Sequence, residues 1–321
     1  MTSPPKTSPQ KASPKTFPKG PTRQPSRLSN LSFRTKEALL YPVEDWWRRR
    51  WGRSHLADPI NQKELQVIGM RRTGNHAVLN WIQQQQPGEV TLLNNVAAGR
   101  NPYRYKADNL RRYHPEHEKM AAVYEAQAKG ALRQRDCLIY SYEDWSLQQI
   151  TAPRFERNRA LYLGKSEKPF DVLLLRDPFN LFASRLKQKF TQTKAPNLSM
   201  VALWVEYAKE FVGESQYLKR NRICVNYNRW FADEDYRREL ADRLDIPFTD
   251  AGIDKVTSFG GGSSFDGTGL SGKARAMDVT SRWQTFADDP VYRQLFENEA
   301  VWDYSAQIFG ELPGTACLQP R

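Results

Sequence analysis

Short apolar runs alternate with segments of helical periodicity from residue 64 to about residue 244, and this order constrains the fold more than any other feature. The apolar runs, which we interpret as strands, are Glu64–Met70, Val90–Asn95, Cys137–Tyr142, Phe170–Leu175 and Arg222–Asn228. Strands that alternate with helices form a parallel sheet with helices on both faces, and continuously apolar strands fit burial on both sides. The sequence therefore predicts an α/β fold, a three-layer sandwich with a central, mostly parallel sheet flanked by helices.

The connecting helices are predicted from the spacing of apolar residues. Residues 73–84 place Ala77, Val78, Trp81 and Ile82 on one face, and residues 197–218 carry an apolar stripe at the same period. An Arg/Asp-rich helix is expected to follow the fifth strand and to end at about Leu244.

The net charge of +12 is distributed unevenly along the chain. Residues 1–56 hold twelve Lys or Arg and three acidic residues, so they carry nine of these twelve net charges. The rest of the chain is close to balanced, which argues against a nucleic-acid partner for the folded body.

Three regions differ in composition. Residues 1–30 are rich in Pro, Ser and Lys with almost no apolar side chains, and we expect them to be disordered. Residues 31–56 form a basic aromatic amphipathic segment, with Trp46, Trp47 and Trp51 around residues 48–50, all arginine. This segment either rests on an anionic membrane surface or packs its tryptophans on the body and leaves its arginines in solvent. Residues 57–321 are expected to form one domain.

The chain lacks the sequence features of a secreted or membrane-spanning protein. No run approaches the ~18 consecutive apolar residues of a transmembrane helix, and the first 30 residues contain no apolar signal core. Cys137, Cys224 and Cys317 are too few and too scattered for a disulfide framework or a zinc site. We therefore expect a cytoplasmic protein without a metal site, in which any peripheral membrane contact involves residues 31–56.

A glycine-bounded loop, Gly69-Met70-Arg71-Arg72-Thr73-Gly74, lies between the first predicted strand and the first predicted helix. Backbone N–H groups and the start of a helix form an anion site in such a loop. Asn75-His76 stands where a nucleoside triphosphatase has Lys-Ser/Thr, so the hydroxyl that binds Mg²⁺ is missing. The alternative is a tight strand–helix turn whose arginines are solvated.

Residues 69–81 (GMRRTGNHAVLNW) resemble the 5′-phosphosulfate loop of the sulfotransferases, and residues 173–184 (LLLRDPFNLFAS) resemble their second motif. In that motif an Arg at a strand end and a Ser eight residues later bind the 3′-phosphate of the nucleotide, here Arg176 and Ser184. Eight residues is just over two helical turns, so Ser184 should lie near the point where Arg176 emerges. The resemblance implies a P-loop nucleoside-triphosphate-hydrolase-like fold.

Two weaker likenesses extend the resemblance to about residue 310. Residues 225–248 resemble the strand and helix that follow the 3′-phosphate motif in the family, and residues 260–286 resemble the flexible basic loop that closes over the nucleotide. Lys273 and Arg275 would then be further 3′-phosphate ligands. On composition alone, the Gly-rich stretch 260–272 fits a plain linker equally well. The cofactor-binding residues that the resemblance implies are Gly69, Arg71, Arg72, Thr73, Gly74, Asn75, His76, Arg176, Ser184, Lys273 and Arg275.

The resemblance implies sulfuryl transfer from 3′-phosphoadenosine-5′-phosphosulfate to a hydroxyl or amine, without a metal. Arg72 is expected to stabilise the developing negative charge, because such transfer depends on positioning and cations. A hydroxyl acceptor also needs a general base. The chain has Asn94-Asn95 where glycan-type members carry a Glu, so Glu143 is the first candidate base, followed by Asp144 and then His76.

The acceptor is predicted only by class, as a carbohydrate or another small molecule. Residues 100–119 interleave Arg100, Arg104, Arg111 and Arg112 with tyrosines, and they either grip an acidic or carbohydrate acceptor or form a solvated loop. Two other functions stay open. One is a P-loop kinase that phosphorylates a small molecule with ATP and Mg²⁺, and the other is an inactive relative that binds a nucleotide or glycan.

Overall fold

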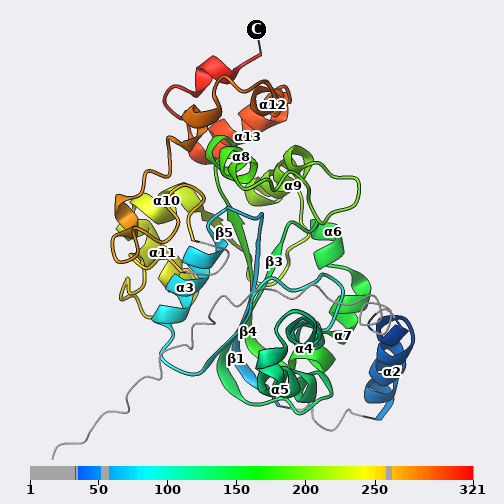
Figure 1. The fold of residues 1–321 in the computed structure, drawn as a ribbon. Coiled ribbons are helices and arrows are strands. Elements are labelled where there is room, and N and C mark those ends of the chain that lie inside the picture. The colour runs from blue at the N-terminus through cyan, green and yellow to red at the C-terminus, as the bar shows by residue number, and fades with distance from the viewer. Residues whose placement is uncertain (1–32, 34, 52–57, 258–261, 321) are drawn as a thin grey trace, which may run out of the picture.

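The computed structural model describes residues 33, 35–51, 58–257 and 262–320. Its centre is a sheet of five strands (Figure 1): β1 (Asn61–Gly69), β2 (Val90–Leu93), β3 (Arg135–Glu143), β4 (Ser166–Leu175) and β5 (Ile223–Asn226). The strand order is β2-β3-β1-β4-β5, and every neighbouring pair is parallel. The predicted α/β class with a parallel sheet is confirmed.

Helices cover both faces of the sheet, which makes three layers (Figure 1). One face packs against α3 (Asn75–Gln85), α10 (Tyr227–Ala232) and α11 (Glu234–Arg243). The other face packs against α4 (Pro102–Tyr113), α5 (Glu118–Ala128), α6 (Leu147–Ile150), α7 (Pro153–Leu163), α8 (Pro178–Lys187), α9 (Met200–Val212), α12 (Pro290–Gln294) and α13 (Glu299–Phe309). Short 3₁₀ turns are Pro115–His117, Ala274–Ala276, Arg282–Phe286 and Thr315–Leu318.

Alternate residues of each strand enter opposite layers, as strand geometry requires. In β4, Val172 and Leu174 pack with α3, whereas Leu173 and Leu175 pack with α8 and α9 on the other face. All four side chains are completely buried. The continuous apolar runs in the sequence therefore correspond to strands that are covered on both sides.

Local capping explains where the elements differ from their predicted limits. The helix expected over residues 197–218 is the shorter α9, because Ser199 caps its start and Gly213, with a φ of 90°, ends it in the left-handed region. The fifth strand ends at Asn226, whose side chain accepts a hydrogen bond from the Arg229 N–H and caps α10.

Residues 100–119 form helical structure instead of a loop. Asn101 caps α4 and Pro102 occupies its first turn. Arg104 is ion-paired with Glu44 and Asp45, Arg100 with Glu37, and Arg111 with Glu118 and Glu125. These three arginines therefore neutralise acids of this protein, and none of them lines the pocket described below.

The segment before the sheet consists of a π-helix (Lys36–Leu40) continued by α2 (Tyr41–Trp51). One of the two arrangements considered for it, tryptophans on the body and arginines in solvent, is wrong for Trp46, Trp47 and Arg48, although Arg49 and Arg50 are exposed. Trp46 and Trp47 are 55% and 54% exposed, whereas Arg48 donates hydrogen bonds to the carbonyls of Ala128 and Leu161. Residues 1–30 lie outside the described part of the chain, so their disorder stays a prediction.

Among the described residues, no helix combines the length and apolar character needed to span a bilayer.

The strand connections diverge between the neighbouring strands β1 and β4, and this divergence positions the site. From β1 the chain continues to β2 at one edge of the sheet, whereas from β4 it continues to β5 at the opposite edge. Neighbouring strands whose connections diverge leave a crevice at their carboxyl ends, where α/β proteins bind ligands. The loop at Gly69–Gly74 and the segment at Arg176 both lie at this edge.

Candidate functional site

The loop after β1 is a tight turn that requires its second glycine. The Thr73 N–H donates to the Met70 carbonyl at 3.2 Å, and the Asn75 amide donates to the same carbonyl at 2.9 Å. Gly74 has a φ of 101°, and a Cβ atom there would collide with the ring of Tyr227. Any other residue at this position would therefore be strained and would displace an aromatic side chain.

The loop leads directly into α3, whose start has no side-chain cap. Gly74 is the N-cap residue and offers no oxygen to the N–H groups of the first turn. Uncapped N–H groups and the helix dipole together favour an anion. Thr73 Oγ1 and Arg72 Nε are buried without a hydrogen-bond partner among the described residues. Two unsatisfied donors beside a helix start fit a phosphate or sulfate group.

The structure brings Arg176 and Ser184 together. Arg176 follows β4, and its Nη1 lies 3.4 Å from Ser184 Oγ on α8. Asp177 caps α8 by accepting from the Asn180 N–H at 2.8 Å, which fixes the helix relative to the strand end. Arg176 Nε is another buried donor without a hydrogen-bond partner among the described residues, although it lies 3.9 Å from Asp177 Oδ2. The contact agrees with the eight-residue spacing, and the binding role of the two residues stays a prediction.

Four arginines line one pocket, namely Arg71, Arg72, Arg176 and Arg282. Burial lowers the pKa of Arg72, and the charge of Arg176 lowers it further. Burial and the nearby Arg176 also lower the pKa of Arg282 to about 10. Like charges that destabilise one another in a partly desolvated pocket are stabilised by a bound anion.

Arg282 was missed by the sequence reasoning, which selected Lys273 and Arg275 from the same segment. Neither Lys273 nor Arg275 lines the pocket. Arg275 is exposed and ion-paired with Asp254 at 2.6 Å, whereas Arg282 is buried and bonded to Ser263 and Asp266. The available signal was the position of Arg282 beside Trp283, because a residue next to a buried Trp is held close to the body.

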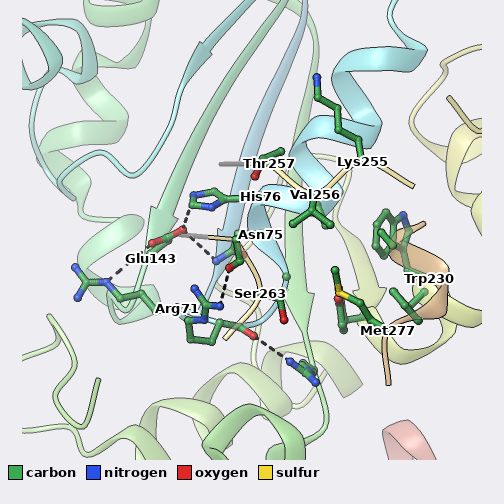
Figure 2. Close-up of a pocket in the computed structure, with 18 of the residues that line it drawn as sticks. Arg71, Asn75, His76, Glu143, Trp230, Lys255, Val256, Thr257, Ser263 and Met277 are labelled. Atoms are coloured by element: carbon green, nitrogen blue, oxygen red, sulfur yellow. Dashed lines mark hydrogen bonds and ion pairs between the residues drawn. The ribbon is translucent and has the colours of Figure 1, made fainter. Parts of the chain in front are cut away.

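An acidic end of the pocket is built around Glu143, the last residue of β3 (Figure 2). Its carboxylate accepts a hydrogen bond from the Asn75 amide at 3.3 Å and lies 3.8 Å from His76 Nε2 and 4.0 Å from Arg71 Nε. Asn94 Nδ2 is 3.0 Å from His76 Nε2. Glu143 is only 7% exposed, but it lines the pocket, so its carboxylate is positioned to meet a ligand.

Asp144 has a different environment, although it is the next residue. It is fully buried and accepts hydrogen bonds from the Arg71 N–H at 2.9 Å and from Arg185 Nη1 at 2.6 Å. Asp144 does not line the pocket. It therefore holds the Gly69–Gly74 loop in place, and this position disfavours the second candidate base.

The opposite end of the pocket is apolar. Trp230, Val256 and Met277 lie on the side away from Glu143 (Figure 2). The pocket has a volume of about 480 Å³, which is within the usual range for small-molecule sites. An apolar end, a set of arginines and a single carboxylate follow one another along its length.

Two lysines near Glu143 were also missed by the sequence reasoning. Lys106 on α4 donates to the Asn94 carbonyl at 3.1 Å, and Lys194 donates to Asn95 Oδ1 at 2.6 Å. Burial lowers the pKa of each to about 8. Neither residue belongs to a recognisable motif, so the sequence contained no signal for them.

No protein-family model matches the chain, and no curated protein does so. Among solved structures, the mouse sulfotransferase SULT7A1 complexed with PAP is similar at 9% sequence identity and a TM-score of 0.41. The match covers 83% of this chain and 91% of that chain. The α/β class rests on the strand order and the two covered faces of the sheet, not on this likeness.

Proposed function

We propose that this protein is a sulfotransferase that moves a sulfuryl group from 3′-phosphoadenosine-5′-phosphosulfate to a hydroxyl or amine of a carbohydrate or another small molecule. The observation that carries the proposal is the pairing of two anion sites in one pocket. The Gly69–Gly74 loop with the start of α3 is one, and Arg176, whose Nη1 lies 3.4 Å from the fully buried Ser184 Oγ behind the lining, is the other. A nucleotide with phosphates on both its 5′ and 3′ positions uses two such sites, whereas the contiguous phosphates of ATP use one.

The residues present fit the donor along the whole pocket. The loop and the start of α3 would hold the 5′-phosphosulfate, and Arg176, Ser184 and Arg282 would hold the 3′-phosphate. The apolar end at Trp230 and Met277 would receive the adenine ring of the nucleotide. The donor supplies an activated sulfuryl group, and Arg72 would stabilise the negative charge that develops on the oxygen leaving sulfur.

Glu143 is the general base in this proposal. It ends β3 directly beside Gly69 of β1, so it stands where the phosphate loop begins. The Asn75 amide fixes its orientation. Glu143 would take the proton of the acceptor hydroxyl as the acceptor oxygen bonds to sulfur and the bond from sulfur to the phosphate oxygen breaks. His76 would support this carboxylate through the 3.8 Å contact.

The donor site is tested by thermal unfolding with 3′-phosphoadenosine 5′-phosphate (PAP), compared with ATP and Mg²⁺. Ligand at 100 times its dissociation constant should add about 2.7 kcal/mol to the unfolding free energy if it binds only the folded protein. We expect PAP to stabilise wild type and Arg238→Ala, an exposed control, but not Arg176→Ala. Arg176→Lys guards against misfolding, because it keeps the charge and should retain part of the effect. Stabilisation by ATP and Mg²⁺ alone would favour a kinase and refute the proposal.

The base is tested with Glu143→Gln, which keeps the shape of the side chain. We expect PAP to stabilise this variant as it does wild type, while transfer of labelled sulfate to a panel of sugars, phenols and amines falls about 100-fold or more. If wild type binds PAP but labels no member of the panel, the chain fits a nucleotide-binding relative without activity. Equal transfer by both proteins would remove Glu143 from the mechanism.

A further inference from the structure

The helical segment Lys36–Trp51 exposes an apolar face to solvent. Leu39, Leu40, Val43, Trp46 and Trp47 are 66%, 46%, 53%, 55% and 54% exposed. Their spacing of three, four and seven residues puts them on one side of a helix, and we call this set the apolar face. Contiguous exposed apolar side chains of this kind mark an interaction surface.

The opposite side of the segment is bound to the body, so the helix cannot turn this face inward. Arg48 donates to the carbonyls of Ala128 and Leu161 at 2.5 and 2.6 Å, and Arg49 donates to Asn158 at 2.8 Å. The buried Asp45 accepts from Tyr162 at 2.7 Å. Figure 1 shows α2 on the outside of the molecule, beside α7. The exposure of the apolar face is therefore enforced by polar contacts on the other side.

The chain that leads into this segment is strongly basic. Residues 1–36 contain eight Lys or Arg and no acidic residue. Polybasic chain next to a helix with Trp and Leu on one face is typical of proteins that bind anionic bilayers, where Trp prefers the headgroup layer. A stable protein–protein interface takes about 20–30 residues a side, which is far more than these five side chains offer.

We propose that the apolar face docks the protein on an anionic lipid bilayer, with its five side chains in the headgroup layer. This inference does not depend on the proposed reaction, because none of the five side chains lines the candidate site. It identifies a lipid bilayer as the partner of a surface that stays exposed in the folded protein.

Sedimentation of the full chain with lipid vesicles tests the docking. We expect binding to vesicles of phosphatidylcholine with phosphatidylserine, weaker binding at high salt, and none to phosphatidylcholine alone. Trp46→Gln/Trp47→Gln should bind about tenfold or more weakly, because both side chains lose their burial in the bilayer. The thermal unfolding of this variant should match that of wild type, since both side chains are exposed.

A pair of valines provides a matched control. Val43 on the apolar face and Val291 on α12 are 53% and 58% exposed, so Val43→Ser should weaken vesicle binding and Val291→Ser should not. Equal binding by wild type and the double Trp variant would mean that charge alone drives the contact, and would overturn the proposal. Absence of vesicle binding would overturn it too. If wild type were then dimeric in sedimentation equilibrium and the double variant monomeric, the face would be an interface between two copies.

Discussion

Two clusters of arginines are buried at opposite ends of the sheet, and they differ in their counter-charges. In the amino-terminal half, Arg159 and Arg220 surround Glu64, which accepts from them at 3.1 and 2.7 Å, and Arg220 also reaches Asp171. At the carboxyl edge, Arg72 donates to the Gly262 carbonyl at 2.9 Å but makes no ion pair within 4.0 Å among the described residues, and Arg176 lies close enough to lower its pKa. Arg176 and Arg282 each have one acid nearby, Asp177 at 3.9 Å and Asp266 at 3.2 Å. The first cluster is therefore neutralised internally, and the second only in part.

The pKa shifts follow this difference. Burial alone would raise the pKa of Glu64, but Arg220 and Arg159 hold it below its usual range. At the other edge, burial and a neighbouring cation lower the pKa of Arg72 and of Arg282. A buried arginine thus stabilises the fold where acids neutralise it, and favours an external anion where they do so only in part, as at Arg282 with Asp266, or form no ion pair, as at Arg72.

Removing the acid from the neutralised cluster should have the largest effect. We expect Glu64→Gln to lower the unfolding free energy by about 3–5 kcal/mol, because two buried arginines lose their shared partner. Urea denaturation measures the loss. The exposed ion pair between Glu234 and Arg238 is the control, and Glu234→Gln should cost about 1 kcal/mol or less. Similar losses in both variants would contradict the contrast between the clusters.

Removing an arginine from the carboxyl-edge cluster should change the unfolding free energy little but should weaken ligand binding. We expect Arg72→Met to leave the unfolding free energy within about 1 kcal/mol of wild type, or to raise it, because a repulsive charge is lost. Affinity for PAP, measured by calorimetry, should fall about 10- to 100-fold, the value of one hydrogen bond to a charged group. A large loss of stability with unchanged affinity would mean that Arg72 is structural.

A third prediction concerns the pH dependence of stability and Lys194. Burial and Arg71 lower its pKa to about 8, although Glu143 and Asp144 oppose this shift. Between about pH 8 and the pKa of ~10.4 for an unfolded Lys, the unfolded chain binds more protons, so stability gains from this group as pH rises. Lys194→Met should lack that gain. Urea denaturation of wild type and the variant from pH 7 to pH 10 gives two stability curves, and their difference separates the contribution of Lys194 from that of Lys106. A difference that does not change with pH would contradict the prediction.

The parts of the site that could be predicted from sequence are those fixed by local geometry. The contact between Arg176 and Ser184 follows from the rise of a single helix, and the loop after β1 follows from a strand, two glycines and a helix. The start of α4 could also be predicted from the sequence, because Asn101-Pro102 is a typical helix start.

The remaining features depend on contacts between distant parts of the chain. Arg282 enters the pocket, while Arg275 turns outward to Asp254, and no pattern in that segment separates the two. An amphipathic helix likewise has two plausible inner faces. For α2 the choice is made by acceptors on α5 and α7, the Ala128 and Leu161 carbonyls, whose positions are set only in the folded chain.

The register of β1 has a consequence for how such a protein can change. Gly69 pairs with Glu143 on one side and with Leu174, two residues before Arg176, on the other. Arg176, proposed to bind the nucleotide, and Glu143, the proposed general base, therefore end the two strands that pair with β1 on its opposite sides. Insertions on the β2–β3 flank can reshape the acceptor side while the β4–β5 flank stays constant. The end of β3 is tied to the donor side, because Glu143 and Asp144 accept hydrogen bonds from Asn75 and Arg71.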